Sequence, residues 1–169
     1  MTISAGVLTK QGWIRQSDNL HSDIDDITAD VSALSFDHHI PNWHMYFIQD
    51  PLVKAHVFPD YVKHHCRMLI VFAVDTVAWG RPHPDLWDRV GFEDREAYLD
   101  DMFSIMRGDE NLQRDRAMQS VGMAAGLAAA SARRLDYEVE IINRLDAAKL
   151  ANAIKIPETH EIAMVLSLR

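Results

Sequence analysis

The chain has 169 residues, of which 48% are hydrophobic and 25% are charged; these values are ordinary for a globular protein and favour one domain over residues 1–169. Its 17 basic and 25 acidic residues give a net charge of −8, and because no basic cluster interrupts this balance, we expect neither a nucleic-acid nor a membrane partner. A single cysteine, Cys66, excludes an internal disulfide and a cysteine-pair zinc site. With no signal peptide or spanning segment in the sequence, we expect a cytoplasmic protein.

The first half of the sequence carries both helical and extended patterns. An amphipathic helix is predicted over 22–34, where Ile, Val and Leu recur three and four positions apart. Residues 43–48 are aromatic and β-prone and predict a strand, which a helix follows to about residue 65. The continuous apolar run 67–75 is typical of a strand covered on both faces.

The second half opens with a Pro- and Gly-rich loop at 79–91 and a helix that ends at Gly108. A short strand is predicted at 139–142, a helix at 147–154 and a last strand at 162–168. Helices and strands that mix without regular alternation favour an α+β fold, with a central, mostly antiparallel sheet flanked by helices.

The segment 112–134 has the most distinctive pattern. From Ala117 to Ala132 nearly every side chain is apolar or small, which predicts a central helix buried almost all round. Gly122, Gly126 and Ala130 recur four residues apart and allow another backbone to approach closely. We therefore expect a homodimer in which this helix packs against its copy.

The series of elements from Trp43 to Leu168 resembles the nitroreductase family of FMN oxidoreductases. Asn42 to Asp50 resembles the family's Pro-Trp-x-Phe-x-x-x-x-Asp strand, and the next strand ends in Asp, as it does in the family. The segments that match in order are 42–50, 68–75, 115–130, 136–146 and 153–168. The resemblance implies a dimeric nitroreductase-like fold with FMN at the subunit interface.

By this resemblance the protein takes hydride from NADH or NADPH and passes it through FMN to an electron-poor acceptor such as a nitroaromatic or a quinone. Because the cofactor carries this chemistry, no catalytic acid, base or nucleophile is expected from the chain. The absence of Gly-x-Ser-x-Gly, His-Glu-x-x-His and P-loop motifs is consistent with that expectation.

The resemblance also implies which residues bind FMN. Arg15, Gln16 and Ser17 match the family's phosphate clamp, although they can equally be a solvated helix end. Asp37 falls near a ring-contacting Asn of the family, and His39 lies in the same segment.

The residues after the short strand complete this set. Ile142, Asn143 and Arg144 stand where the family places backbone against the flavin, and Arg144 would bring positive charge to the ring. The alternative is a polar turn between strand and helix. The clamp has one arginine where the family usually has two. A second interpretation is therefore a non-catalytic scaffold or binding protein that has lost flavin affinity.

Nine histidines favour a third interpretation, a metal-binding protein. However, adjacent histidines on a helix point about 100° apart, and no carboxylate-histidine motif stands at ligand spacing. No metal site is therefore predicted. Trp43 and Cys66 are expected to be core residues.

Overall fold

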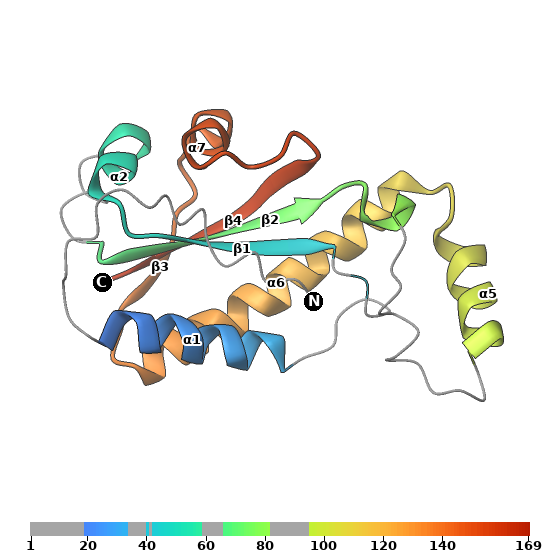
Figure 1. Ribbon diagram of the computed structural model, residues 1–169, viewed down its shortest axis with the longest axis horizontal. Helices are drawn as coiled ribbons and strands as arrows, with labels where there is room; N and C mark the ends of the chain where they lie inside the picture. Colours follow the sequence, from blue (N-terminus) through green and yellow to red (C-terminus); the bar gives the residue numbers. More distant parts are fainter. Residues whose placement is uncertain (1–18, 34–39, 41, 59–65, 82–94) are drawn as a thin grey trace.

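The computed structural model describes residues 19–33, 40, 42–58, 66–81 and 95–169, and a four-stranded antiparallel sheet lies at the centre of them (Figure 1). In spatial order the strands are β1 (Trp43–Ile48), β2 (Met68–Asp75), β4 (His160–Leu168) and β3 (Val139–Ile141). All three neighbouring pairs are antiparallel. The α+β fold with an antiparallel sheet, predicted from the sequence, is confirmed.

Helices cover both faces of the sheet (Figure 1). One face carries α1 (Asn19–Ser32) and α6 (Glu110–Arg134), which pack against each other, and the opposite face carries α2 (Pro51–Val57) and α7 (Ala147–Ile154). The remaining long helix, α5 (Arg95–Met106), lies beyond the end of the sheet. Among the described helices, none is long and apolar enough to span a bilayer.

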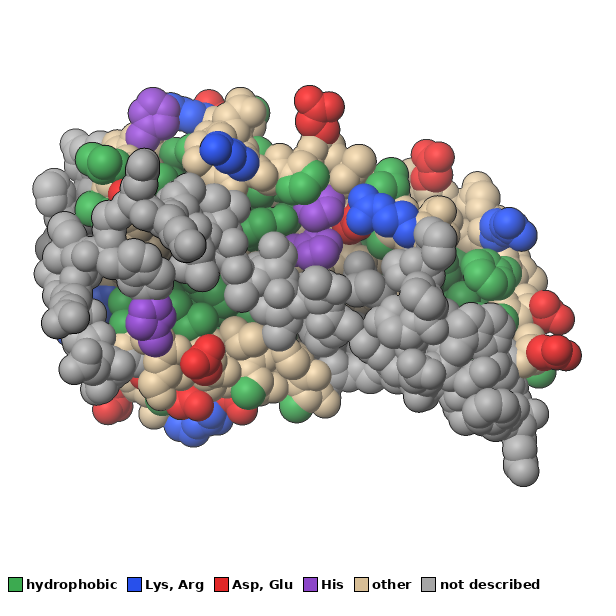
Figure 2. Space-filling model, in the orientation of Figure 1, with side chains coloured by type: hydrophobic (Ala, Val, Ile, Leu, Met, Phe, Trp, Pro, Cys, Tyr) green, Lys and Arg blue, Asp and Glu red, His purple; other side chains and the backbone are tan. Residues whose placement is uncertain are grey.

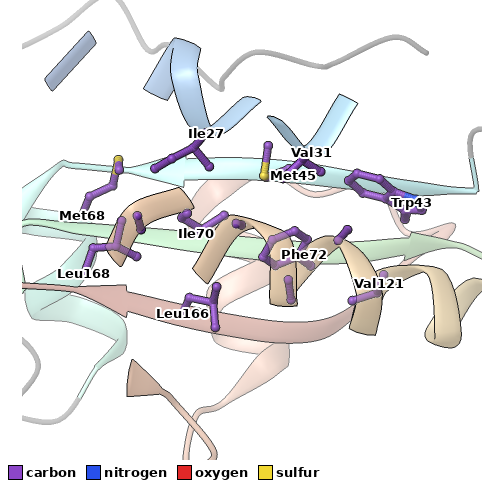
Figure 3. Packing of buried hydrophobic residues seen from close by; sticks show 14 of the residues in the cluster. Ile27, Val31, Trp43, Met45, Met68, Ile70, Phe72, Val121, Leu166 and Leu168 are labelled. Carbon is purple, nitrogen blue, oxygen red and sulfur yellow. The ribbon is translucent and has the colours of Figure 1, made fainter. Parts of the chain in front are cut away.

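The core has two halves because successive side chains of a strand point to opposite faces of the sheet. Ile70 and Phe72 of β2 pack with α1 and α6, and Figure 3 shows them in one cluster with Ile27 and Val31 of α1. Leu69 and Val71 pack on the α2 and α7 side. Every residue of β2 is buried, as the continuous apolar run predicts.

The central helix α6 is buried on one side only. Small side chains, among them Ala124 and Ala128, bring it close to the sheet. The side that faces away from the sheet is exposed at Gly122, Met123 and Gly126. Near-complete burial, which the apolar composition predicts, is thus wrong for the chain by itself, because α1 and the sheet together cover only part of the helix.

Most predicted elements agree with the structure to within three residues at each end. The helix expected after the 43–48 strand, to about residue 65, is described as far as Val57. It begins at Pro51, and the preceding Asp50 caps it, since its Oδ1 accepts from the backbone N–H of Leu52 at 2.8 Å. Residues 59–65 and 82–94 lie outside the described part, so the predicted loop at 79–91 is described only as far as Arg81. Trp43 and Cys66 are buried, as expected.

Candidate functional site

Three polar side chains meet at one end of the sheet, on the face that α2 and α7 cover elsewhere. His44 belongs to β1, Asp75 ends β2 and His160 begins β4. Asp75 Oδ2 lies 3.6 Å from His160 Nε2 and 3.9 Å from His44 Nε2. One potential ligand atom from each of the three residues lies within 4.8 Å of the other two.

The strand register explains this meeting. Asp75 is directly opposite His160 in the β2–β4 pair. His44 is opposite Ala73 in the β1–β2 pair, which makes it a diagonal neighbour of Asp75 on the same face. Side chains in these positions are within interaction distance across an antiparallel sheet.

A β-bulge is essential to this register. Phe72 pairs with Met164, but the next residue of β2, Ala73, pairs with Ile162, so β4 contains one extra residue. If β4 continued in regular register beyond the Phe72–Met164 pair, Asp75 would face Glu161 and two carboxylates would be adjacent. Bulges of this kind re-aim side chains and are frequent beside functional sites.

The bulge also determines where Glu161 points. Its carboxylate lies on the α6 side and forms a two-bond ion pair with Arg114, with Nε to Oε2 at 3.0 Å and Nη2 to Oε1 at 2.7 Å. Both side chains are about half exposed, at 48% and 45%. The bulge thus separates one surface ion pair from the buried cluster.

Asp75 is a buried carboxylate whose partners come from the chain immediately after β2. Its Oδ1 accepts from the backbone N–H of Val77 at 3.1 Å, and its Oδ2 accepts from Arg81 Nη1 at 2.7 Å. Only 2% of the Asp75 side chain is exposed, against 47% for Arg81. The arginine therefore neutralises the buried charge from the solvent side.

The two imidazoles are held against each other. The rings of His44 and His160 stack with centroids 4.4 Å apart and planes 10° apart, and Figure 2 shows two adjacent histidine side chains beside acidic and basic atoms on this face. Tyr46 Oη lies 3.2 Å from His160 Nδ1, a hydrogen bond whose direction depends on the tautomer. Among the described residues, neither ring nitrogen of His44 has a hydrogen-bond partner, although both nitrogens are buried.

Burial lowers the pKa of His44, and the neighbouring His160 lowers it further. Burial also lowers the pKa of His160, against the opposing effect of Asp75. Both rings are therefore neutral near pH 7, with a lone pair on one nitrogen of each. Burial raises the pKa of Tyr46, which stays a neutral phenol.

The residues predicted to bind flavin fall into two groups. Arg15, Gln16, Ser17, Asp37 and His39 lie outside the described residues. Those that follow β3 are described.

Ile142 is buried, and its backbone N–H donates to Val165 O at 2.9 Å. Asn143 and Arg144 are exposed. This group adjoins the middle of β4, whereas His160 begins that strand, so the His44–Asp75–His160 cluster is a separate place on the sheet.

This cluster is not predicted from the sequence. Histidines that are neighbours in the sequence do not form it, because its three residues come from three strands that are distant along the chain. The available signal was positional: each residue stands at or near the end of a predicted strand. That signal becomes useful only when the strand order and the register are known.

No known family profile matches the chain, whereas solved structures do. A nitroreductase family protein from Streptococcus pneumoniae superposes with a TM-score of 0.71 at 12% identity, over 92% of this chain and 82% of that one. The chain has the nitroreductase fold. The resemblance inferred from the sequence is therefore confirmed at the level of the fold.

Two further structures with this fold carry information about flavin. A protein of Exiguobacterium sibiricum solved in complex with FMN superposes with a TM-score of 0.71 at 15% identity, over 92% of this chain and 78% of that one. A Staphylococcus epidermidis protein described as an NAD(P)H:FMN oxidoreductase gives 0.72 at 12% identity, over 88% and 75%.

Among curated proteins, protein DrgA of Synechocystis is 25% identical over 130 residues. That alignment covers 75% of this chain and 62% of DrgA. The chain thus matches less than two-thirds of the length of this relative.

Proposed function

We propose that the protein is an FMN-dependent oxidoreductase that passes hydride from NADH or NADPH to an electron-poor small molecule, such as a nitroaromatic or a quinone. The observation that carries the proposal is the nitroreductase fold, shared with a protein solved in complex with FMN. A protein with the same fold described as an NAD(P)H:FMN oxidoreductase supports the choice of hydride donor.

The described residues after β3 have chemistry that suits a flavin ring. Ile142 is a buried apolar side chain, and it is followed by two exposed polar ones, Asn143 and Arg144. An apolar wall next to a few polar groups is the usual composition of a cofactor site. This composition supports the proposal that the group contacts FMN.

FMN, when bound, supplies the hydride chemistry. The chain's residues bind and orient it. The amide of Asn143 offers both a donor and an acceptor to the polar edge of the ring. The guanidinium of Arg144 brings a permanent positive charge, which favours electron-rich states of a neighbouring group.

The phosphate of FMN needs a cation on another part of the chain. We assign that role to Arg15, with Gln16 and Ser17 as polar neighbours and with Asp37 and His39 beside the ring. These assignments rest on the sequence resemblance. Their common test is the FMN affinity of single variants.

We further propose that the protein is a homodimer built on α6. The exposed side of this helix includes Gly122, Met123, Gly126 and Ala130, and Met123 is 54% exposed. A Cβ atom added at Gly122 or Gly126 would meet none of the described residues within 4 Å. Small residues with open space in front of them allow a second copy of the helix to approach closely, as a two-fold axis requires.

The direct experiment is to titrate FMN into the purified chain and then supply NADH or NADPH with a nitroaromatic or a quinone. We expect saturable FMN binding and acceptor-dependent oxidation of the nicotinamide. A matched control is Lys149→Ala, an exposed cation of α7, which should bind FMN like the wild type. A folded protein that binds no FMN would overturn the proposal and favour the non-catalytic scaffold.

A further inference from the structure

We propose that His44, Asp75 and His160 form a binding site for a divalent transition-metal ion such as Zn²⁺. Two imidazoles and one carboxylate are a ligand set that suits such ions. The proposal is independent of flavin binding, and it departs from the sequence-based expectation that no metal site is present.

The candidate ligand atoms lie at distances close to those that one bound ion requires. Asp75 Oδ2 is 3.6 Å from His160 Nε2 and 3.9 Å from His44 Nε2. Both separations are too long for a hydrogen bond. Two ligands that each lie about 2.1 Å from one tetrahedral ion are about 3.4 Å apart, so each of the two nitrogen–oxygen separations is within a few tenths of an ångström of the value that such an ion requires.

The imidazole of His44 is available to a ligand. Both of its ring nitrogens are buried, and neither makes a hydrogen bond within the described part of the chain. A buried polar group in this state carries a desolvation cost that a ligand can remove. The side chain is 16% exposed and that of Asp75 is 2% exposed, so a small ion, rather than a large molecule, fits the site.

His160, whose side chain is 6% exposed, is oriented with one ring nitrogen toward Asp75. Its Nδ1 is hydrogen-bonded to Tyr46 Oη at 3.2 Å, and its Nε2 faces Asp75. A hydrogen bond on one ring nitrogen that leaves the other for the ion is a common arrangement of metal-binding histidines. Because the two rings are stacked almost parallel, one of them has to rotate about its Cβ–Cγ bond, a torsion with a broad energy well.

The positive charge of Arg81 stands where a bound ion would place its own. Arg81 Nη1 lies 2.7 Å from Asp75 Oδ2, the oxygen that would bind the ion. Because about half of the Arg81 side chain is exposed, it can move into solvent. We infer that the arginine and the ion compete for Asp75, with the arginine neutralising the carboxylate while no metal is bound.

The test is Zn²⁺ titration of the chelator-treated, FMN-free full chain by calorimetry, with folding checked by circular dichroism. The wild type should bind one Zn²⁺ per chain at this site, and His44→Gln and His160→Gln should each weaken that binding at least about tenfold. The control His56→Gln removes an exposed histidine of α2 and should leave it unchanged. Wild-type Zn²⁺ affinity in both folded His variants would overturn the proposal.

The competition is tested with two arginine variants. Arg81 and Arg114 are similarly exposed and each pairs with a carboxylate at 2.7 Å. Arg81→Gln should strengthen Zn²⁺ binding, because it frees Asp75, whereas Arg114→Gln should have no effect. Weaker or unchanged binding in Arg81→Gln would contradict the competition.

A spectroscopic measurement covers the case in which the His variants fail to fold. Co²⁺ bound by the wild type should give the visible d–d bands of a nitrogen- and oxygen-ligated ion, and excess Zn²⁺ should abolish them. A wild type that gives no such bands at saturating Co²⁺ would overturn the site. FMN titration of the same samples measures the proposed function separately.

Discussion

His44 and His160 stack ring against ring, with centroids 4.4 Å apart, although they belong to β1 and β4, the first and last described strands along the chain. Asp75 is a carboxylate that faces both rings, and it forms an ion pair with Arg81. One buried carboxylate that is already paired cannot also neutralise two stacked imidazolium ions. The arrangement therefore depends on neutral rings.

Protonation of this pair should make the folded protein less stable in acid. The folded-state pKa values of His44 and His160 lie below the ordinary value, so below about pH 6.5 the unfolded chain binds more protons than the folded one. The stabilising contribution is present above that pH and is lost as the pH falls through the folded-state pKa values. Among the described residues, the other titratable or charged groups that face the pair are Asp75, Arg81 and Tyr46.

Urea unfolding in metal-free buffer between about pH 7.5 and about pH 5.5 checks this prediction. As the pH is lowered, the free energy of unfolding should decrease in the wild type and should decrease less steeply in His44→Gln. If the free energy of unfolding changes equally with pH in the two proteins, the stacked pair does not contribute to the pH dependence of stability.

Two ion pairs of equal length should contribute unequally to stability. Arg81→Gln leaves the buried Asp75 carboxylate with the Val77 N–H alone, and should lower the free energy of unfolding by about 1–3 kcal/mol. Arg114→Gln breaks an exposed pair and should cost less than about 1 kcal/mol. Chemical denaturation of both variants at neutral pH measures the difference, and equal losses would contradict the account.

Gly126→Leu should separate folding from association. The added Cβ meets no atom of the described part of the chain within 4 Å, and Leu is a better helix former than Gly by up to about 1 kcal/mol. The variant should fold normally but lose the proposed dimer, because the side chain occupies space that the partner helix needs. Ala148→Leu, at an exposed position of α7, is the control.

Light scattering at micromolar concentration gives the outcome. The wild type and Ala148→Leu should have twice the chain mass of 19.3 kDa, and Gly126→Leu should have the mass of one chain. A wild type with the mass of one chain would remove the proposed interface.

Two arginine variants should weaken FMN binding in different ways. Arg15→Ala should cost about 2–3 kcal/mol of FMN affinity, the usual value for a charge-assisted hydrogen bond. The same variant should lower the affinity for riboflavin, which lacks the phosphate, much less. Arg144→Ala should weaken FMN and riboflavin alike, because its proposed contact is with the ring. Fluorescence titration with both flavins distinguishes the two roles. Unchanged FMN affinity in Arg15→Ala would show that another residue binds the phosphate.

The sequence was sufficient for the fold because the signals for its elements are local. The apolar run of β2 and the periodicity of α1 depend on near neighbours along the chain, and both elements appear where predicted. Burial of α6 was less predictable. Apolar composition shows that Met123 belongs against something apolar, but not whether that partner is in the same chain.

The His44–Asp75–His160 cluster was beyond sequence reasoning because it depends on one extra residue in β4. The register shift after Phe72 places His160, and not Glu161, opposite Asp75. No local pattern in β4 announces that bulge. The candidate flavin residues, in contrast, were accessible through motif resemblance, since Ile142, Asn143 and Arg144 follow a recognisable strand.

The central claim is that this nitroreductase fold binds FMN and uses it, and the most direct measurement is the visible spectrum of the purified chain after incubation with FMN and removal of the free cofactor. The account predicts a yellow protein with one FMN per chain, which NADH or NADPH bleaches under anaerobic conditions and a quinone recolours. A folded protein that stays colourless, or a bound flavin that neither nicotinamide reduces, would contradict it.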